Sequence, residues 1–294
     1  MKILVVGPSK STRGGITSVI FAHQNFSFWK LNNCIWIESY DDKNSMRKIL
    51  FFLKAIIKFF VNLRSSQIVY IHIALGTSAV RKFFFFALAK LFNKKIILHF
   101  HTPGNAVDIP TDLWKVRYMF KNSNRVIVLA NAWKKMIINE FNINNVHVIE
   151  NPAPLARNSY RKNNSILFLG TLSDRKGYKD LLAAYSKIKN EFRDWKIELC
   201  GNGNLKEVEN YVIDLGIEKN VIIRGWVNEK ERYDALEKAS IFCLPSYAEG
   251  LPVSVLEALS FKCAILTSPV GGIPDYFESG KDCLLVQPGE VEEL

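Results

Sequence analysis

The chain has 294 residues, a length that predicts two domains of about 150 residues each. Its 48% hydrophobic and 23% charged residues are typical of a globular protein and argue against disorder and repeat architectures. The net charge of +11 is uneven, because residues 1–157 hold 22 Lys and Arg against seven acids and residues 158–294 hold 17 against 21. The first half therefore predicts an anionic partner, and charge alone leaves lipid, nucleic acid and a phosphorylated substrate open.

The N-terminal apolar run, residues 3–6, is broken by Gly7-Pro8 and is too short for the apolar region of a signal peptide. The cysteines form no Cys-x-x-Cys pair, and several lie in apolar runs, as buried thiols do in a reducing cytosol. They are Cys34, Cys200, Cys243, Cys263 and Cys283. We therefore predict a cytoplasmic protein.

Short apolar runs alternate with helical patterns, which is the rhythm of a doubly wound parallel α/β sheet. In the first half the predicted strands are residues 3–6, 68–73, 95–99, 125–129 and 146–149. The rhythm ends at Asn151-Pro152-Ala153-Pro154, where the prolines prevent regular structure. We place a domain boundary after this segment, so that residues 1–157 form one Rossmann-like domain.

The rhythm restarts in the second half, where residues 158–294 predict a second Rossmann-like domain. Its predicted strands are residues 166–169, 196–199, 221–223, 241–244 and 264–266. The final residues, 289–294, have the pattern of a helix start without a stop signal. We expect from this that the second domain is incomplete.

A glycine pair, Gly14-Gly15, follows the first predicted strand and precedes a helical pattern from Ile16. Such a loop presents backbone N–H groups at a helix N-terminus, where the helix dipole favours an anion. The alternative interpretation is a plain turn, because glycine pairs are common in turns. The pair by itself does not separate the two interpretations.

Two adjacent cations, Arg175 and Lys176, lie between the predicted strand 166–169 and a helix that begins near Tyr178. They follow the carboxyl end of a strand, where open α/β sheets bind ligands, and their charge suits a diphosphate. The alternative is a solvated basic loop, which for an isolated Arg-Lys pair is the commoner case.

The most specific segment is residues 246–259, in which Glu249 and Glu257 are eight residues apart. Gly250 and Pro252 predict a loop that turns into a helix. We therefore expect Glu249 at the mouth of a site and Glu257 about a turn and a half inside the helix. One carboxylate would face the reactive end of a ligand and the other a deeper sugar hydroxyl.

The sequence has no Asp-x-Asp triplet and no His/Cys group with metal-ligand spacing, so we predict no metal and no cofactor. Gly201-Asn202-Gly203 follows a predicted strand, as a dinucleotide-binding fingerprint does. Lys206 stands where that fingerprint needs its third glycine, which disfavours NAD.

The Glu-x7-Glu segment, followed by Gly271-Gly272-Ile273-Pro274-Asp275, resembles the donor-site signature of glycosyltransferase family 4. The resemblance covers most of the chain, because further motifs occur in the family's order: Gly14-Gly15, His101, Asn151-Pro152, Lys176-Gly177 and Gly201-Asn202-Gly203. It implies a GT-B fold, in which two Rossmann-like domains face a central cleft. It also implies a nucleoside-diphosphate sugar held by the second domain, an acceptor held by the first, and net retention without a metal.

The resemblance also implies roles for individual residues. Glu249 would contact hydroxyls of the donor sugar, Glu257 the ribose, and Lys176 the diphosphate as it leaves. His101 would contact the donor sugar near the reaction centre, whereas His23, His72, His99 and His147 rank below it. The other implied donor contacts are Gly14, Gly15, Asn202, Gly250, Leu251, Pro252 and Val253.

One position departs from the family pattern. Many members have Arg directly after the glycine that ends the strand, whereas this chain has Thr171. Arg175 can supply that charge, so Thr171 and Arg175 are both assigned to the expected phosphate site.

Two segments of the basic half, residues 47–64 and 81–90, mix Lys and Arg with wide apolar faces. In the first, Arg47, Lys54 and Lys58 fall within about 40° of one another on a helix. Interfacial helices on anionic lipid have this composition. The alternative is a pair of helices buried against the sheet, with lysines that extend to solvent.

We predict a glycosyltransferase that moves a sugar from a nucleoside-diphosphate sugar to a glycan or lipid-linked acceptor, with retention, in surface polysaccharide synthesis. An anionic membrane surface, at the inner face of the plasma membrane, is a further expected partner, and nucleic acid is not. Two alternatives remain open. A nucleotide-sugar epimerase would need additional acid/base residues in the cleft, and a non-catalytic nucleotide-sugar or membrane-binding module would leave the donor intact.

Overall fold

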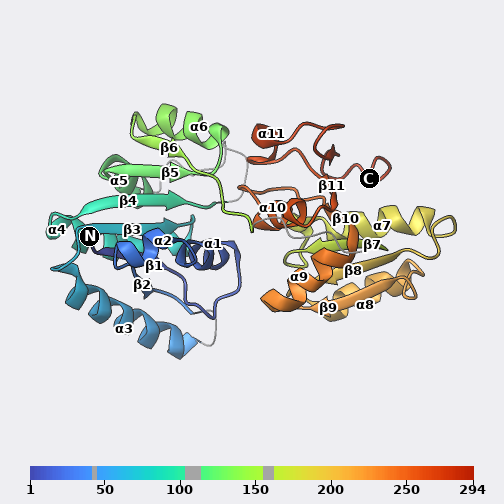
Figure 1. The fold of residues 1–294 in the computed structure, drawn as a ribbon, viewed down its shortest axis with the longest axis horizontal. Helices are drawn as coiled ribbons and strands as arrows, with labels where there is room; N and C mark the ends of the chain where they lie inside the picture. Colours follow the sequence, from blue (N-terminus) through green and yellow to red (C-terminus); the bar gives the residue numbers. More distant parts are fainter. Residues whose placement is uncertain (42–44, 103–113, 155–161) are drawn as a thin grey trace. The chain divides into compact units, whose positions relative to one another are not determined.

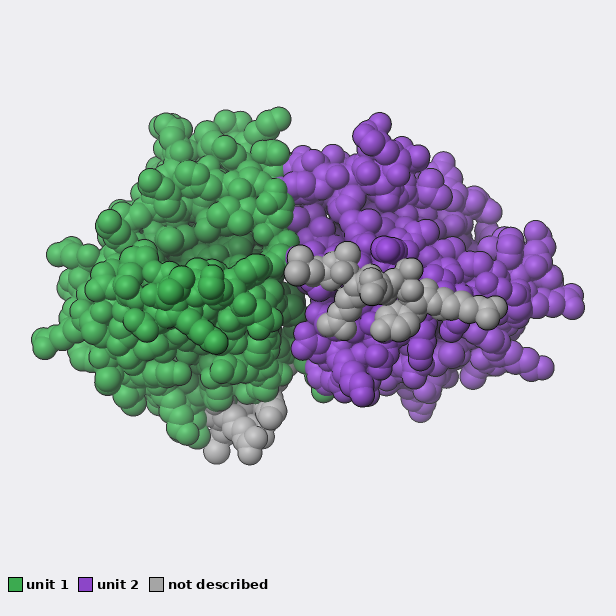
Figure 2. All heavy atoms as spheres, viewed as in Figure 1, with its two compact units in different colours: residues 1–152 green, residues 153–294 purple. Residues whose placement is uncertain are grey.

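The computed structural model describes residues 1–41, 45–102, 114–154 and 162–294. The chain forms two compact units, residues 1–152 and 153–294, which Figure 2 shows in different colours. The boundary expected between residues 157 and 158 lies outside the described residues.

Unit 1 is built on a parallel six-stranded sheet with the order β2-β1-β3-β4-β5-β6 (Figure 1). Its strands are β1 (Ile3–Gly7), β2 (Ile35–Glu38), β3 (Ile68–Ile73), β4 (Lys95–Phe100), β5 (Arg125–Val128) and β6 (Val146–Val148). Its helices are α1 (Gly15–Gln24), α2 (Ser27–Leu31), α3 (Ser45–Leu63), α4 (Thr77–Leu91), α5 (Trp114–Lys121) and α6 (Asn131–Phe141). Every strand predicted in this half is present, and β2 is an addition.

Helices cover both faces of this sheet. From β1 the chain first moves to β2 at the edge and then returns past β1 to β3, so right-handed connections place α1 and α2 on one face and α3 to α6 on the other. Each helix of the second group contributes at least one aromatic residue to the larger core cluster, among them Phe59, Phe85, Phe120 and Phe141. A smaller cluster contains Val5, Ile20 and Trp36. Unit 1 is therefore doubly wound, as predicted.

Unit 2 repeats the architecture with the strand order β12-β11-β10-β7-β8-β9. Its strands are β7 (Asn163–Leu169), β8 (Lys196–Cys200), β9 (Val221–Gly225), β10 (Ala239–Leu244), β11 (Ala264–Thr267) and β12 (Leu284–Leu285). Its helices are the 3-10 turn η1 (Asp174–Lys176), α7 (Tyr178–Ile188), α8 (Leu205–Asp214), α9 (Glu229–Lys238), α10 (Val253–Ser260) and α11 (Ile273–Tyr276). The five strands predicted from the sequence are confirmed here too.

The strand order of unit 2 reverses between β7 and β10, which are neighbours in the sheet. The chain runs from β7 outward to β8 and β9, and from β10 outward in the opposite direction. Loops at the carboxyl ends of two such strands leave toward opposite faces, and ligands of open α/β sheets bind in the crevice between them. The Arg175-Lys176 segment follows β7 and the Glu249 segment follows β10, so both lie at this point.

The C-terminal residues form turns rather than the expected helix. The helix expected at residues 289–294 is absent, because Gly289 adopts φ 86° and the residues form turns. The N–H of Leu294 donates to the carbonyl of Glu290, which closes one turn only.

Among the described helices, none combines the length and apolarity needed to cross a bilayer.

Candidate donor site and histidine cluster

The loop after β7 is held tightly against the segment after β10. Gly177 ends η1 with φ 71°, and a Cβ atom at this position would lie 2.0 Å from the carbonyl oxygen of Pro245. Only glycine permits this backbone conformation and this approach without strain. The N–H of Tyr247 also donates to the carbonyl of Arg175 at 2.8 Å. The two loops are thus joined through their main chains.

This junction brings the predicted cations to the predicted carboxylate. Lys176 Nζ lies 2.5 Å from Glu249 Oε1, and Arg175 Nη1 lies 3.7 Å from the same oxygen. Arg175 also donates to the carbonyl of Ala248 at 2.6 Å. Charge-assisted hydrogen bonds of this kind fix side-chain positions. Two cations share one carboxylate here, so the group keeps a positive charge that suits an anionic ligand.

The backbone that follows Glu249 is fixed by the Gly271-Gly272 pair. The N–H of Gly272 donates to the carbonyl of Gly250 at 2.6 Å. Gly271 has φ 61°, and a Cβ there would lie 2.0 Å from the carbonyl oxygen of Glu249. The second glycine motif of the sequence therefore sets the position of the first carboxylate.

Helix α10 begins directly after this backbone, with Pro252 at its N-cap and Val253 as its first residue. No side chain of residues 1–41, 45–102, 114–154 or 162–294 caps this end of the helix. Leu251 and Pro252 are buried, so the N-terminal turn is held rigidly next to Glu249. Uncapped N–H groups and the helix dipole favour negative charge at this place.

Glu257 lies in α10 with 4% of its surface exposed, and its Oε1 is 3.1 Å from Arg232 Nη2 of α9. Burial raises the pKa of Glu257 to about 7, and the charge of Arg232 opposes that rise. Glu249 is equally buried, at 5%. The expected contrast between an open Glu249 and an enclosed Glu257 is therefore wrong, because Lys176 and the Gly271 turn enclose Glu249.

Thr171 and Asn202 lie in adjacent loops after β7 and β8, and both are exposed. The N–H of Leu172 donates to the carbonyl of Asn202 at 2.8 Å. Gly201 permits this contact, because a Cβ there would lie 1.7 Å from the carbonyl oxygen of Gly170. All the positions assigned to the donor in unit 2 thus lie along one edge of its sheet.

In unit 1, Gly14 is the N-cap of α1 and Gly15 its first residue. Within the described part of the chain, a Cβ on either glycine would meet nothing within 4 Å, and no side chain caps the helix. The loop has the open, uncapped form predicted for an anion site. Its meeting with the donor site of unit 2 stays a prediction.

His101 directly follows β4 and belongs to a cluster of imidazoles. Its Nε2 lies 2.9 Å from His72 Nδ1, and His99 Nδ1 lies 2.6 Å from the hydroxyl of Tyr70. The ring centroid of His23 is 5.9 Å from that of His72. Sequence reasoning ranked these neighbours below His101. The register His72↔His99 and the two-residue spacing of His99 and His101 are the signals that could have revealed the cluster.

Burial keeps the cluster uncharged. It lowers the pKa of His101 to about 3 and that of His23 to about 4, and it places the pKa values of His72 and His99 well below 6.5. The Nε2 atoms of His72 and His99 are buried and have no hydrogen-bond partner among the described residues. Neutral imidazoles with free nitrogens are ligands for a polar group of a substrate or for a metal ion.

The ligand atoms of His72, His99 and His101 lie within 4.8 Å of one another, so these three residues could hold a metal ion. Tetrahedral zinc holds its ligand nitrogens about 3.4 Å apart, so the 2.9 Å contact between His101 Nε2 and His72 Nδ1 would have to open for both atoms to bind it. The fully buried Lys82 lowers the pKa of His72 through its charge, which also disfavours a dication nearby. Metal-independent chemistry therefore stays a prediction.

Comparison with known proteins identifies unit 2. Residues 154–294 match the model of the family "Glycosyl transferases group 1". Unit 2 belongs to this family. An uncharacterised glycosyltransferase of Haemophilus influenzae is 32% identical over 178 residues, which cover 58% of this chain and 49% of that protein.

A second relative carries a defined activity in its name. It is the Campylobacter jejuni enzyme GalNAc-alpha-(1->4)-GalNAc-alpha-(1->3)-diNAcBac-PP-undecaprenol alpha-1,4-N-acetyl-D-galactosaminyltransferase, which is 37% identical over 131 residues, or 44% of this chain and 35% of that enzyme. This chain thus spans half or less of the length of these glycosyltransferases.

The fold agrees with a solved structure over the full length of this chain. The crystal structure of Anabaena HepE in complex with UDP superposes with a TM-score of 0.71 at 15% identity, covering 100% of this chain and 87% of that one. The two tandem doubly wound sheets are those of the GT-B fold, as the family resemblance implied.

Proposed function

We propose that this protein is a glycosyltransferase that moves a sugar from a nucleoside-diphosphate sugar to a glycan or lipid-linked acceptor in surface polysaccharide synthesis. The observation that carries the proposal is the contact of Lys176 and Arg175 with Glu249 at the switch point of a group 1 unit. The relatives support it, since one acts on an undecaprenol-linked glycan by its name and one related fold holds UDP.

In this proposal the diphosphate of the donor lies between Lys176, Arg175 and the N-terminus of α10. As the bond from the anomeric carbon to the diphosphate oxygen breaks, negative charge grows on the leaving group, and these groups stabilise it. The diphosphate competes with Glu249 for Lys176, which releases lone pairs of Glu249 to accept hydrogen bonds from sugar hydroxyls. Donor binding thereby exchanges an internal ion pair for two ligand contacts.

We propose retention by front-face displacement. The acceptor hydroxyl forms its bond to the anomeric carbon on the face from which the diphosphate leaves, and its proton passes to a phosphate oxygen. Such a step needs positioning and leaving-group stabilisation, which the Lys176, Glu249 and α10 geometry supports. It requires no metal ion. His101 would contact the donor sugar, and the neighbouring neutral imidazoles would hold it in place.

The inner face of the plasma membrane is the proposed site of action, because a lipid-linked acceptor is presented at a membrane surface. Nucleic acid has no part in the proposal. The epimerase alternative has one observation in its favour, since Glu257 with a pKa of about 7 is tuned for proton transfer.

Slow hydrolysis of the donor in the absence of acceptor tests this proposal. UDP-GlcNAc, UDP-GalNAc and UDP-glucose are incubated with the chain, and the released sugar is followed by proton NMR before it mutarotates. Retention predicts that the α-anomer appears first, and that Lys176→Ala slows its release. A first-formed β-anomer would exclude retention, and an epimerised nucleotide sugar would establish the alternative function.

A further inference from the structure

Helix α3 has two apolar faces, of which only one packs on the sheet. Ala55, Phe59 and Leu63 are buried in the core of unit 1. Six other apolar residues are between 51% and 71% exposed: Ile49, Leu50, Leu53, Ile57, Phe60 and Val61. At about 100° per residue these six fall within an arc of about 120° that lies away from the buried residues. A soluble helix needs only the first face.

The exposed face continues onto α4. Val80, Phe84 and Leu91 are 43%, 50% and 74% exposed and recur at helical spacing along one side of that helix. Two aromatic pairs join the helices, since the rings of Phe52 and Phe84 and those of Phe60 and Phe92 are each 5.7 Å apart. The two exposed faces therefore form one surface.

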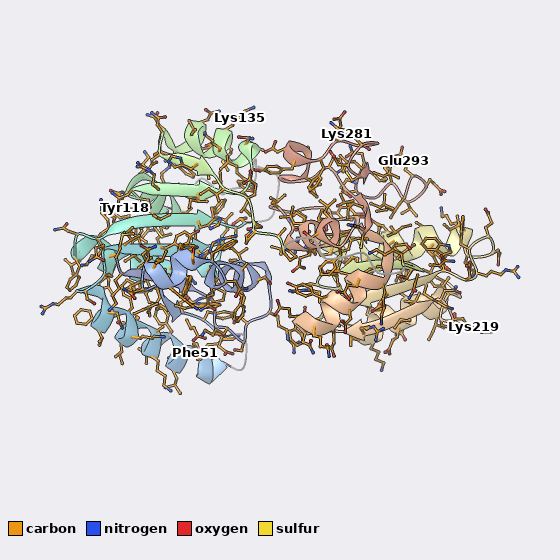
Figure 3. All side chains as sticks on the ribbon, viewed as in Figure 1. Phe51, Tyr118, Lys135, Lys219, Lys281 and Glu293 are labelled. Carbon is orange, nitrogen blue, oxygen red and sulfur yellow. The ribbon has the colours of Figure 1, made fainter. Side chains whose placement is uncertain are left out.

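Helix α5 extends the same surface. Trp114 and Tyr118 are 61% and 45% exposed, and the ring of Phe83 in α4 lies 5.4 Å from that of Trp114. Figure 3 shows side chains projecting from these helices, with Phe51 and Tyr118 labelled. We call the exposed apolar residues of the three helices the α3–α5 surface. A contiguous exposed apolar patch of this extent marks an interaction site.

The three helices that form this surface carry charge of one sign. Together α3, α4 and α5 contain ten Lys and Arg and no Asp or Glu. Lys54 and Lys58 fall just beyond the edge of the apolar arc of α3, and Arg64 follows its C-terminus. None of these three forms an ion pair with a described carboxylate. Lys58 Nζ donates to the carbonyl of Trp36 at 3.0 Å, whereas the charges of Lys54 and Arg64 are available to an external anionic partner.

We infer that the α3–α5 surface docks unit 1 on an anionic lipid bilayer. An apolar arc flanked by lysines, with Trp and Tyr at its border, matches the layered chemistry of a bilayer interface, where acyl chains lie beneath anionic headgroups. Charge decides between lipid and a second copy of this chain, because two equally basic surfaces would repel each other. The inference rests on unit 1 and is independent of the donor site in unit 2.

Vesicle sedimentation tests this inference with the whole chain. We expect binding to vesicles of phosphatidylcholine mixed with phosphatidylglycerol, weaker binding to phosphatidylcholine alone, and partial release by salt. Leu53→Glu combined with Ile57→Glu should weaken binding at least about tenfold, because both apolar side chains are lost from the interface. Lys54→Gln combined with Arg64→Gln should weaken it roughly fivefold per charge on the anionic vesicles only.

The matched control is Phe192→Glu combined with Ile213→Glu, which changes two residues of similar exposure in unit 2 and adds the same charge. It should bind vesicles almost as the unaltered chain does. Absence of binding to anionic vesicles at low salt would overturn the inference. Equal binding by the Leu53→Glu, Ile57→Glu variant and by the Phe192→Glu, Ile213→Glu control would overturn it as well. A dimer in light scattering that dissociates in the Leu53→Glu, Ile57→Glu variant would also overturn the inference, since a second copy of the chain would then cover the surface. Nucleotide binding, measured in parallel, reports separately on the donor site.

Discussion

Replacing Gly271 by alanine is predicted to displace Glu249 while leaving the rest of unit 2 folded. A Cβ at Gly271 would lie 2.0 Å from the carbonyl oxygen of Glu249 and 2.7 Å from that of Gly250, whereas real contacts stay above 3.0 Å. The Glu249 backbone must therefore move by about 1 Å, and a displacement of that size can reduce catalysis about a hundredfold. The positive φ adds a conformational cost of about 1 kcal/mol to folding.

Gly280 provides the matched control. Its φ of 82° imposes a similar conformational cost, but a Cβ there would meet no atom of the described residues within 4 Å. We expect Gly280→Ala to lower the free energy of unfolding by about 1 kcal/mol and to leave donor hydrolysis unchanged. Gly271→Ala should reduce the rate of donor hydrolysis at least tenfold in the same assay, while its circular dichroism spectrum stays that of a folded protein. Full activity of Gly271→Ala, or equal losses in both variants, would refute this account of how the glycine pair positions Glu249.

Three further predictions concern charge and protons. The pKa of Glu257 is about 7 in the folded chain against an ordinary 4.5, so between these pH values only the unfolded chain loses this proton. The free energy of unfolding should therefore fall as pH rises from about 4.5 to 7. Glu257→Gln should remove this pH dependence in urea unfolding, and an unchanged dependence would contradict the raised pKa of Glu257. The lowered pKa values of the buried imidazoles, such as that of His101, predict the opposite trend in unit 1, where stability should be lost as pH falls below about 6.5. His101→Asn should therefore shift the midpoint of acid unfolding to lower pH. An unchanged midpoint would count against a buried neutral imidazole at this position. Donor hydrolysis should survive dialysis against a chelator. Activity that is lost on dialysis and recovered with zinc, but not recovered in His99→Ala, would show instead that the histidine cluster is a metal site.

The strands could be predicted from the sequence because buried parallel strands are continuous apolar runs. β2 was missed, although Ile35–Glu38 is as long as β5 and β11, which were predicted. The two-residue β12 gives no pattern at all. Short edge strands depend on pairing with a neighbour, and one sequence does not show which neighbour that is.

The positions of the residues assigned to the donor, after β7 and after β10, were predictable, but their mutual contacts were not. Lys176 and Glu249 are 73 residues apart, and they meet because β7 and β10 are neighbours in the sheet. Arg232, the partner of Glu257, lies in a helix rich in charge, where nothing in the sequence distinguishes it from its neighbours. The depth of Glu249 was likewise misjudged, because it depends on the distant Gly271 turn.

The central claim is that unit 2 binds a nucleoside-diphosphate sugar through Lys176 and Glu257, and calorimetric titration with UDP, GDP and their common sugars tests it most directly. Lys179→Ala is the control, since Lys179 is an adjacent cation that pairs with Asp174 and Glu207 away from Glu249. The account predicts micromolar binding of one nucleotide, weakened about tenfold or more by Lys176→Ala and by Glu257→Ala but little by Lys179→Ala. Equal affinity in all four proteins, or no binding of any nucleotide, would contradict it.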